Sequence, residues 1–298
     1  MTAAMPCDSK DRFGIDIGRR LALQAAIDWA VERGVRHIDL CLDSDSELLR
    51  NSSPKRKDAA ARLKREGIVL GLHTLSAVNV AESAPFLSEA CDAYLEAYVD
   101  AANALGAGWI VVHAGFHFTG DKQDRMEAAL TRLDRVSRIA ERAGVTLLLE
   151  NMNREPDDAE VKYLGHDLDE CRYFFDQLHS PNMRWSYTVN HAHLLSGGIE
   201  GFLNGMDLKR CGEVRLADCR GTVEEHLRIG EGTIDFPATF RLLESAGYRG
   251  HYMLAFKSLD VMYEDRELLA RMLNEVTVVL GQESSGSERV STNVSKER

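Results

Sequence analysis

A single phrase recurs along this chain: an amphipathic helix, then a glycine, then a short apolar strand. The copies read "VERGVRHIDLCL", "LKREGIVLGLH", "ALGAGWIVVHAG", "AERAGVTLLLEN" and "ESAGYRGHYMLAF". The glycine of each copy stands where a helix ends in a left-handed cap, a conformation that glycine adopts without steric cost. These caps are predicted at Gly34, Gly67, Gly106, Gly144 and Gly247. Regular alternation of helices and strands favours an α/β fold built on a parallel sheet.

Eight strands are expected, and most are apolar throughout, as in a parallel sheet that is covered on both faces. They span residues 13–17, 36–41, 68–73, 109–113, 145–150, 184–188, 213–217 and 251–256. An open doubly wound sheet is the rival fold, but no G-x-G-x-x-G follows the first strand. The length of 298 residues suits one closed barrel. The sequence therefore predicts an α/β fold, a single-domain (β/α)8 TIM barrel over residues 13–280.

Two tails lack this pattern. Residues 1–12 show little periodicity, and residues 281–298 are polar and rich in serine. Segments of this composition bury too little apolar surface to offset the entropy of ordering. We expect a disordered N-terminal tail over 1–12 and a disordered C-terminal tail over 281–298.

The composition indicates in which compartment the protein resides and which classes of partner it binds. A net charge of −11 and a pI near 5.4 argue against nucleic acid and anionic membranes as partners. Six cysteines without a C-x-x-C pair favour a reducing compartment. No apolar run approaches the length of a membrane span, and no signal peptide is evident. The sequence predicts a cytoplasmic protein with a small-molecule partner, and a homo-oligomer stays possible.

Polar side chains stand where most of the predicted strands end. Active sites of (β/α)8 barrels form at the carboxyl ends of the strands, so these side chains should meet at one mouth. The candidates are His73, His113, Glu150, Asn151, His191, Arg215, His226 and Lys257. We expect a functional pocket at this end of the barrel.

Several of these segments resemble one known superfamily. "LGLHTLSAVNVA", "IVVHAGFH", "LLLEN", "NHAHLL" and "EEHLRIGEGTIDF" are similar to the xylose isomerase-like, AP endonuclease family 2 barrels, which include sugar-phosphate isomerases and epimerases. The likeness covers about residues 13–280. It implies one divalent metal held by Glu, Asp, His and Glu from strands five to eight. The matching positions here are Glu150, Thr188, Arg215 and Ala255, so three of the four ligands are missing.

The loss of these ligands predicts an enzyme without a metal cofactor at the usual place. An arginine within several ångströms of a divalent cation is repelled by a few kcal/mol. We expect Arg215 to take over the electrostatic task of the metal and to stabilise an enolate, an alkoxide or an anionic group of the substrate.

A shifted metal site is the alternative. His73, His113 and Glu150 match an accessory subsite that the resemblance implies for multi-metal members. Two imidazoles and a carboxylate are a legitimate zinc set with an open fourth position. Zinc or manganese therefore stays open as a cofactor. A further half-site could combine His191 and His226 with Glu224 or Glu225.

The hypothesis is an isomerase, epimerase or lyase that abstracts a proton next to a carbonyl of a small sugar-like keto or acid substrate. Glu150 is the expected base, its pKa raised by burial. His191 or His226 is the expected partner acid, and Arg215 is the third catalytic residue. Substrate contacts are expected from His73, His113, Asn151 and Lys257.

Two rival functions follow from the same residues. Loss of three ligands is also typical of a catalytically silent barrel that binds a sugar-like ligand or a partner subunit. An abasic-site nuclease fits poorly, because the acidic charge opposes binding to a phosphate backbone.

Overall fold

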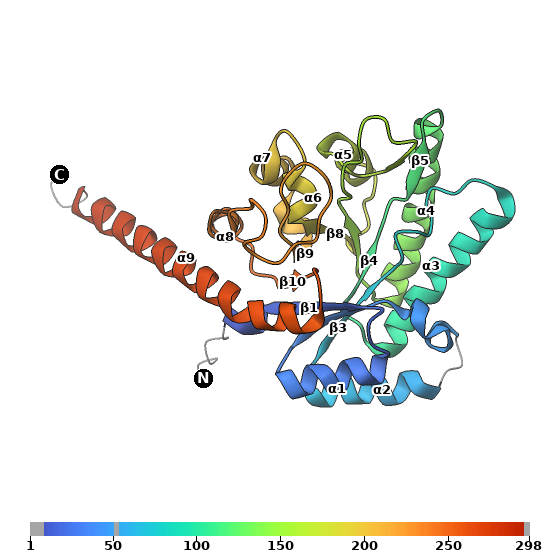
Figure 1. The fold of residues 1–298 in the computed structure, drawn as a ribbon, viewed down its shortest axis with the longest axis horizontal. Coiled ribbons are helices and arrows are strands. Elements are labelled where there is room, and N and C mark those ends of the chain that lie inside the picture. The colour runs from blue at the N-terminus through green and yellow to red at the C-terminus, as the bar shows by residue number, and fades with distance from the viewer. Residues whose placement is uncertain (1–8, 51–53, 295–298) are drawn as a thin grey trace.

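Eight parallel strands close into a barrel in the computed structural model, which describes residues 9–50 and 54–294 (Figure 1). The order around the barrel is β1-β10-β9-β8-β6-β4-β3-β2. The strands are β1 Phe13–Gly18, β2 His37–Leu40, β3 Val69–His73, β4 Trp109–Val112, β6 Leu147–Glu150, β8 Met183–Thr188, β9 Cys211–Leu216 and β10 Tyr252–Leu254. All eight coincide with predicted strands to within three residues at either end, and the predicted (β/α)8 barrel is confirmed.

Helices cover the outside of the barrel and connect its strands. They are α1 Leu23–Arg33, α2 Pro54–Glu66, α3 Pro85–Leu105, α4 Lys122–Ala143, α5 Leu168–Phe175, α6 Val189–His193, α7 Gly198–Gly205, α8 Phe236–Ser245 and α9 Leu259–Val294. Short 3-10 turns lie at η1 Ser9–Arg12, η2 Leu42–Ser44, η3 Ser46–Leu49 and η4 Leu208–Arg210. The five predicted cap glycines all have positive φ, between +60° and +89°. A small antiparallel pair, β5 Phe116–Phe118 and β7 Val161–Tyr163, forms a second sheet.

The C-terminal segment differs from the expected disordered tail over 281–298. Helix α9 packs on α8, β1 and η1, continues to Val294 and projects away from the barrel (Figure 1). A packed helix extends at low cost, because each further residue adds one hydrogen bond without a new nucleus. At the other end, residues 9–12 form η1, whereas residues 1–8 and 295–298 lie outside the described part of the chain.

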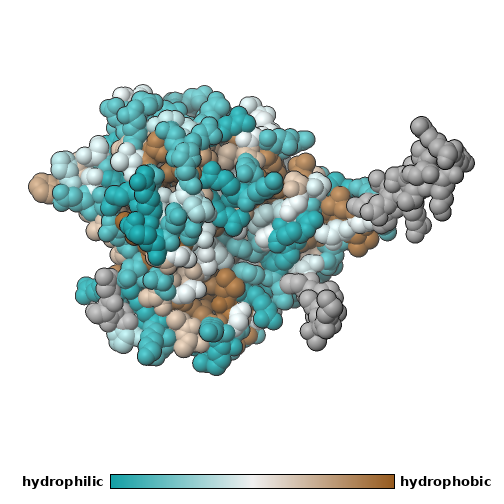
Figure 2. Space-filling view, turned by 180° about the vertical axis from the view of Figure 1, so that it is seen from behind, coloured by the Kyte–Doolittle hydropathy of each residue, from teal (hydrophilic) through white to brown (hydrophobic). Residues whose placement is uncertain are grey.

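Within the described residues, no helix is both long and apolar enough to span a membrane. The face opposite to the one seen in Figure 1 is largely hydrophilic, and its apolar side chains lie in small patches (Figure 2). Scattered apolar patches of this kind are normal for a protein surface.

The interior of the barrel holds a buried ion cluster among its apolar side chains. Arg215, on β9, is 2% exposed and donates to Asp39 Oδ2 at 2.5 Å and Glu213 Oε1 at 3.0 Å through Nη1. Its Nη2 donates to Asp16 Oδ2 at 2.6 Å. Asp39 also accepts from the indole Nε1 of Trp109 at 3.0 Å. Buried charges persist only where partners of this kind compensate the cost of desolvation.

Candidate active site

A cavity of about 290 Å³ opens at the carboxyl ends of the strands. It is lined by Asp16, Arg20, His73, Ser76, His113, Glu150, Met152, His191, Arg215, Glu224, His226, Ala255, Phe256 and Lys257. Seven of the eight candidates from the sequence line this one cavity. The exception is Asn151, whose side chain binds the backbone of Thr188.

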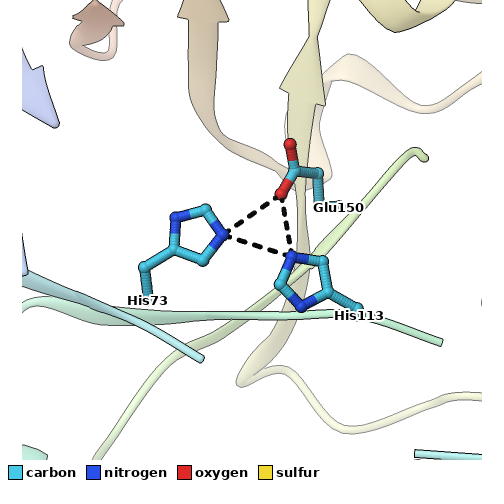
Figure 3. Close-up of side chains that lie close together, drawn as sticks. All are labelled: His73, His113 and Glu150. Atoms are coloured by element: carbon cyan, nitrogen blue, oxygen red, sulfur yellow. Dashed lines mark hydrogen bonds and ion pairs between the residues drawn. The ribbon is translucent and has the colours of Figure 1, made fainter. Parts of the chain in front are cut away.

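The first cluster combines two imidazoles and a carboxylate from β3, β6 and the residue that follows β4 (Figure 3). The Nε2 atoms of His73 and His113 lie 3.2 Å apart, and Glu150 Oε2 lies 3.4 Å and 3.2 Å from them, respectively. The other carboxylate oxygen, Oε1, accepts a hydrogen bond from the Thr188 hydroxyl. Glu150 is 5% exposed, so these contacts replace solvent around its charge.

The second cluster joins His191 in α6 to Glu224 and His226 in the loop that follows β9. Glu224 Oε1 lies 3.2 Å from His191 Nε2 and 3.0 Å from His226 Nε2. Both rings place Nδ1 against a backbone carbonyl, His191 on Asn151 O at 2.7 Å and His226 on Ala255 O at 2.6 Å. Because a carbonyl only accepts, Nδ1 carries a proton in both rings, and Nε2 of each ring faces the Glu224 carboxylate.

Glu150 also lies near His191 of the second cluster and near Arg215 of the buried ion cluster. Its Oε1 lies 3.9 Å from His191 Nδ1 and 3.8 Å from Arg215 Nε. Burial raises the Glu150 pKa, but hydrogen bonds from His113 and His73 and the charge of Arg215 outweigh it and hold the pKa well below its usual range. The expectation of a raised Glu150 pKa is therefore wrong, because its partners stabilise the anion more strongly than burial destabilises it.

The surroundings of Arg215 also correct the task expected of it. Three carboxylates accept hydrogen bonds from its two Nη groups, so the guanidinium balances charges inside the barrel, and its Nε lies beside Glu150. Two of these carboxylates, Asp16 and Asp39, belong to β1 and β2. Their partner lies 199 and 176 residues away in the sequence, and local sequence patterns do not reveal such a pairing.

Asn151 has a positioning role in place of the expected contact with substrate. Its Nδ2 donates to Thr188 O at 3.0 Å, and its Oδ1 accepts from Thr188 N at 2.7 Å. The side chain is 2% exposed and joins the ends of β6 and β8. Its backbone carbonyl holds the His191 ring.

Lys257 stands at the rim of the cavity, and its ammonium pairs with Glu231. Sequence reasoning missed Arg20, Ser76 and Met152 and considered Glu224 only as a neighbour of His226. The "GRR" directly after the first strand was an available signal for Arg20.

The side chains present test whether a metal fits. The position of the four-ligand site implied by the family resemblance does not fit a cation, because Thr188 donates to Glu150 there and the Arg215 guanidinium lies beside it. The cluster of His73, His113 and Glu150 does fit. Ligands at 2.0–2.1 Å from a tetrahedral zinc lie about 3.3–3.4 Å apart, and the three separations here are 3.2, 3.4 and 3.2 Å. The Glu224 cluster is a further possible ligand set.

The Glu224 carboxylate makes the stability of the fold depend on pH. Burial raises its pKa, but hydrogen bonds from His191 and His226 outweigh this and lower the pKa from 4.5 to about 2. The stabilisation is fully present above the unfolded-state pKa and is lost as the pH falls toward the folded-state value. We expect wild type to exceed Glu224→Gln in urea midpoint at about pH 6, with the difference shrinking from about pH 5 to 3. A difference that does not change with pH would contradict this.

The sequence matches the xylose isomerase-like TIM barrel family over residues 27–272. The fold is similar to a D-tagatose 3-epimerase-like protein, with a TM-score of 0.80, 21% identity and coverage of 90% of this chain and 99% of that one. It is also similar to 3-keto-D-glucoside 4-epimerase from E. coli, with a TM-score of 0.69, 17% identity and coverage of 88% and 98%. Identities this low show a shared fold alone.

Among sequence relatives, the uncharacterized protein MJ1311 of Methanocaldococcus jannaschii is 26% identical over 183 residues. That match spans 60% of this chain and 60% of the relative. A second uncharacterized protein of the same organism, MJ1614, is 27% identical over 146 residues, which cover 46% of this chain and 51% of the relative.

Proposed function

Because the chain belongs to the xylose isomerase-like TIM barrel family, we propose that it is an isomerase or epimerase of a small polyhydroxylated carbonyl compound. The reaction moves a proton at a carbon next to the carbonyl. Two of the structurally similar proteins carry the names 3-epimerase-like protein and 4-epimerase, which supports a ketose-like substrate.

The observation that carries the proposal is the pair of carboxylate–imidazole clusters on one cavity. An epimerisation removes a proton from one face of a carbon and returns one to the other face, so it needs two groups that exchange protons at different places around the substrate. The Glu150 cluster comes from β3, β4 and β6, and the Glu224 cluster comes from the segments that follow β8 and β9. The two clusters therefore lie side by side around the rim of the cavity.

Glu150 is the proton acceptor in this mechanism. Its low pKa keeps it ionised over the working range of pH, and a substrate oxygen that takes the hydrogen bonds of His73 and His113 removes contacts that lower the pKa. The carboxylate therefore becomes more basic when the substrate is bound.

His226 is the proton donor. Burial lowers its pKa, but the hydrogen bonds with Glu224 and with the Ala255 carbonyl outweigh it, so the net pKa is raised and the protonated ring is favoured. His191 bridges the clusters through Glu224 and its contact with Glu150. The charge of Arg215 lowers the pKa of Glu150 and of the buried Glu213.

The test is proton exchange at the reacting carbon. The purified protein is incubated in D2O with a panel of ketoses, ketose phosphates and keto-acids, and loss of the proton signal next to the carbonyl is followed by NMR. We expect exchange with at least one member of the panel. Binding of panel members without exchange would favour the silent barrel, and neither binding nor exchange would contradict both functions.

A metal-bound form of the same enzyme is the second candidate, favoured by the separations within the cluster of His73, His113 and Glu150. A bound divalent ion would supply Lewis-acid polarisation of a substrate oxygen. After dialysis against zinc, we expect about one equivalent in wild type and much less in His113→Gln. Equal zinc in both proteins would contradict this ligand set.

A further inference from the structure

Arg20 differs from the other two cationic side chains on the cavity in having no anionic partner among the side chains that the structure describes. Arg215 is surrounded by carboxylates, and Lys257 pairs with Glu231. Arg20 lies on the rim shortly after β1, and among residues 9–50 and 54–283 no carboxylate lies within ion-pair distance of its guanidinium. A positive charge at the mouth of a cavity, without a counter-ion, attracts anionic ligands.

Backbone contacts hold this guanidinium in place. Its Nη1 donates to Asp16 O at 3.2 Å and Ile17 O at 3.4 Å, and its Nη2 donates to Lys257 O at 3.0 Å. A guanidinium has five N–H donors. These bonds leave the Nε–H and one Nη2–H, on adjacent nitrogens, without a partner in the described part of the chain. Two such donors match the two oxygens of a carboxylate or phosphate.

The backbone conformations at Gly18 and Lys257 favour this position of the Arg20 guanidinium. Gly18 has a φ of +56°, and a Cβ built on it would lie 3.4 Å from Arg20 Nη1, so the turn after β1 brings the guanidinium over the end of its own strand. Lys257 has a φ of +37°. It is the only non-glycine residue with positive φ among residues 9–50 and 54–294, and its carbonyl is the one that Arg20 Nη2 contacts. Strained backbone of this kind clusters at ligand sites.

An unpartnered acceptor lies beside the same strand end. Asp16 Oδ2 accepts from Arg215, whereas its buried Oδ1 has no hydrogen-bond partner. Asp16 lines the cavity, so a ligand hydroxyl that reaches this buried oxygen would meet an acceptor without another hydrogen bond. A buried acceptor left without a partner is costly, and a ligand hydroxyl would remove that cost.

We infer that Arg20, with Lys257 beside it, forms a subsite for an anionic group, and that the substrate is a sugar acid or sugar phosphate. The carboxylate or phosphate binds the open edge of Arg20, and a hydroxyl of the same molecule donates to Asp16 Oδ1. The inference rests on the proposed function for its reaction and adds the class of substrate.

The test compares three compounds that share one carbon skeleton: D-fructose, D-fructuronate and D-fructose 6-phosphate. The rate of proton exchange in D2O gives kcat/KM for each with wild type, Arg20→Ala, Arg20→Lys and Arg19→Ala. The last variant removes the same charge from the adjacent exposed residue, which does not line the cavity.

We expect one of the two anions to exceed fructose by roughly tenfold or more in kcat/KM, and that anion identifies the group. Arg20→Ala should remove most of this preference. Arg20→Lys should restore part of it, because an ammonium keeps the charge but not the paired donors. Arg19→Ala should retain the wild-type preference. An equal loss for all three compounds in Arg20→Ala, or no preference in wild type, would overturn the subsite.

An error in the proposed function would give a different experimental result from an error in the Arg20 subsite. If none of the three compounds exchanges a proton, calorimetric binding of fructuronate and inorganic phosphate decides the subsite alone. Affinity roughly tenfold or more weaker in Arg20→Ala than in Arg19→Ala would support it. Equal affinity in the two variants, or no binding to wild type, would overturn it.

Discussion

Replacing Arg215 with methionine is expected to lower the free energy of unfolding by about 3–5 kcal/mol, measured by urea denaturation near neutral pH. The substitution keeps much of the side-chain volume and removes the charge. Asp39 and Glu213 are fully buried, and both lose their closest cationic donor. Removing one member of a buried ion cluster leaves uncompensated charges, which is costlier than the loss of the attraction itself.

Two comparisons isolate the cause of that loss. Adding Glu213→Gln to Arg215→Met should recover part of the lost stability, because one stranded carboxylate becomes neutral. Arg135→Met serves as a surface control. Its partners Asp92 and Glu96 are partly exposed, so the loss should be within about 1 kcal/mol. A loss of similar size in both single variants would contradict the account of Arg215.

Replacing Glu150 with glutamine is expected to slow proton exchange on an identified substrate by roughly 10²–10⁴-fold. The shape is retained, and the amide oxygen can still accept from the Thr188 hydroxyl. The amide cannot take up the proton, so the reaction loses its base. NMR exchange rates at saturating and limiting substrate would separate this loss of turnover from a loss of binding.

Glu170→Gln is the matched control for this substitution. Glu170 is likewise buried and paired with a histidine and a lysine, yet it is not among the residues that line the cavity. Its variant should exchange protons at the wild-type rate per folded molecule. Undiminished exchange by Glu150→Gln would remove Glu150 from the mechanism.

The barrel was predictable because its signals are local. Apolar strands and glycine-capped helices are written in windows of about a dozen residues, and the carboxyl ends of parallel strands must meet. His73, His113, Glu150 and His191 could therefore be expected around one cavity from the sequence, and all four line it. The contacts among these side chains, in contrast, depend on the folded structure.

The electrostatics of the site were not predictable in the same way. Whether burial or hydrogen bonding controls the Glu150 pKa depends on two imidazoles at 3.2 and 3.4 Å and on a guanidinium, contributed by three other strands or strand ends. The sequence also indicated an arginine in place of a metal ligand, but not the three carboxylates that neutralise it. The local sequence pattern identifies which ionisable side chains lie at the mouth of the barrel. Only the folded structure shows which of them already form ion pairs with one another.

Four positions of the site correspond, by family resemblance, to the ligands of a divalent metal. At the four positions matched by family resemblance, Glu150 remains, Thr188 donates to it, Arg215 lies beside it, and Ala255 supplies a carbonyl to His226. N–H and O–H donors thus surround a carboxylate that the resemblance implies as a metal ligand.

The most direct measurement is a crystal structure of the protein soaked with the compound from the panel that exchanges fastest. We predict that the reacting carbon lies between the Glu150 carboxylate and the His226 ring, with Arg215 still bound to its carboxylates inside the barrel. A ligand bound outside this cavity, or an Arg215 side chain directed away from the barrel interior, would contradict the account.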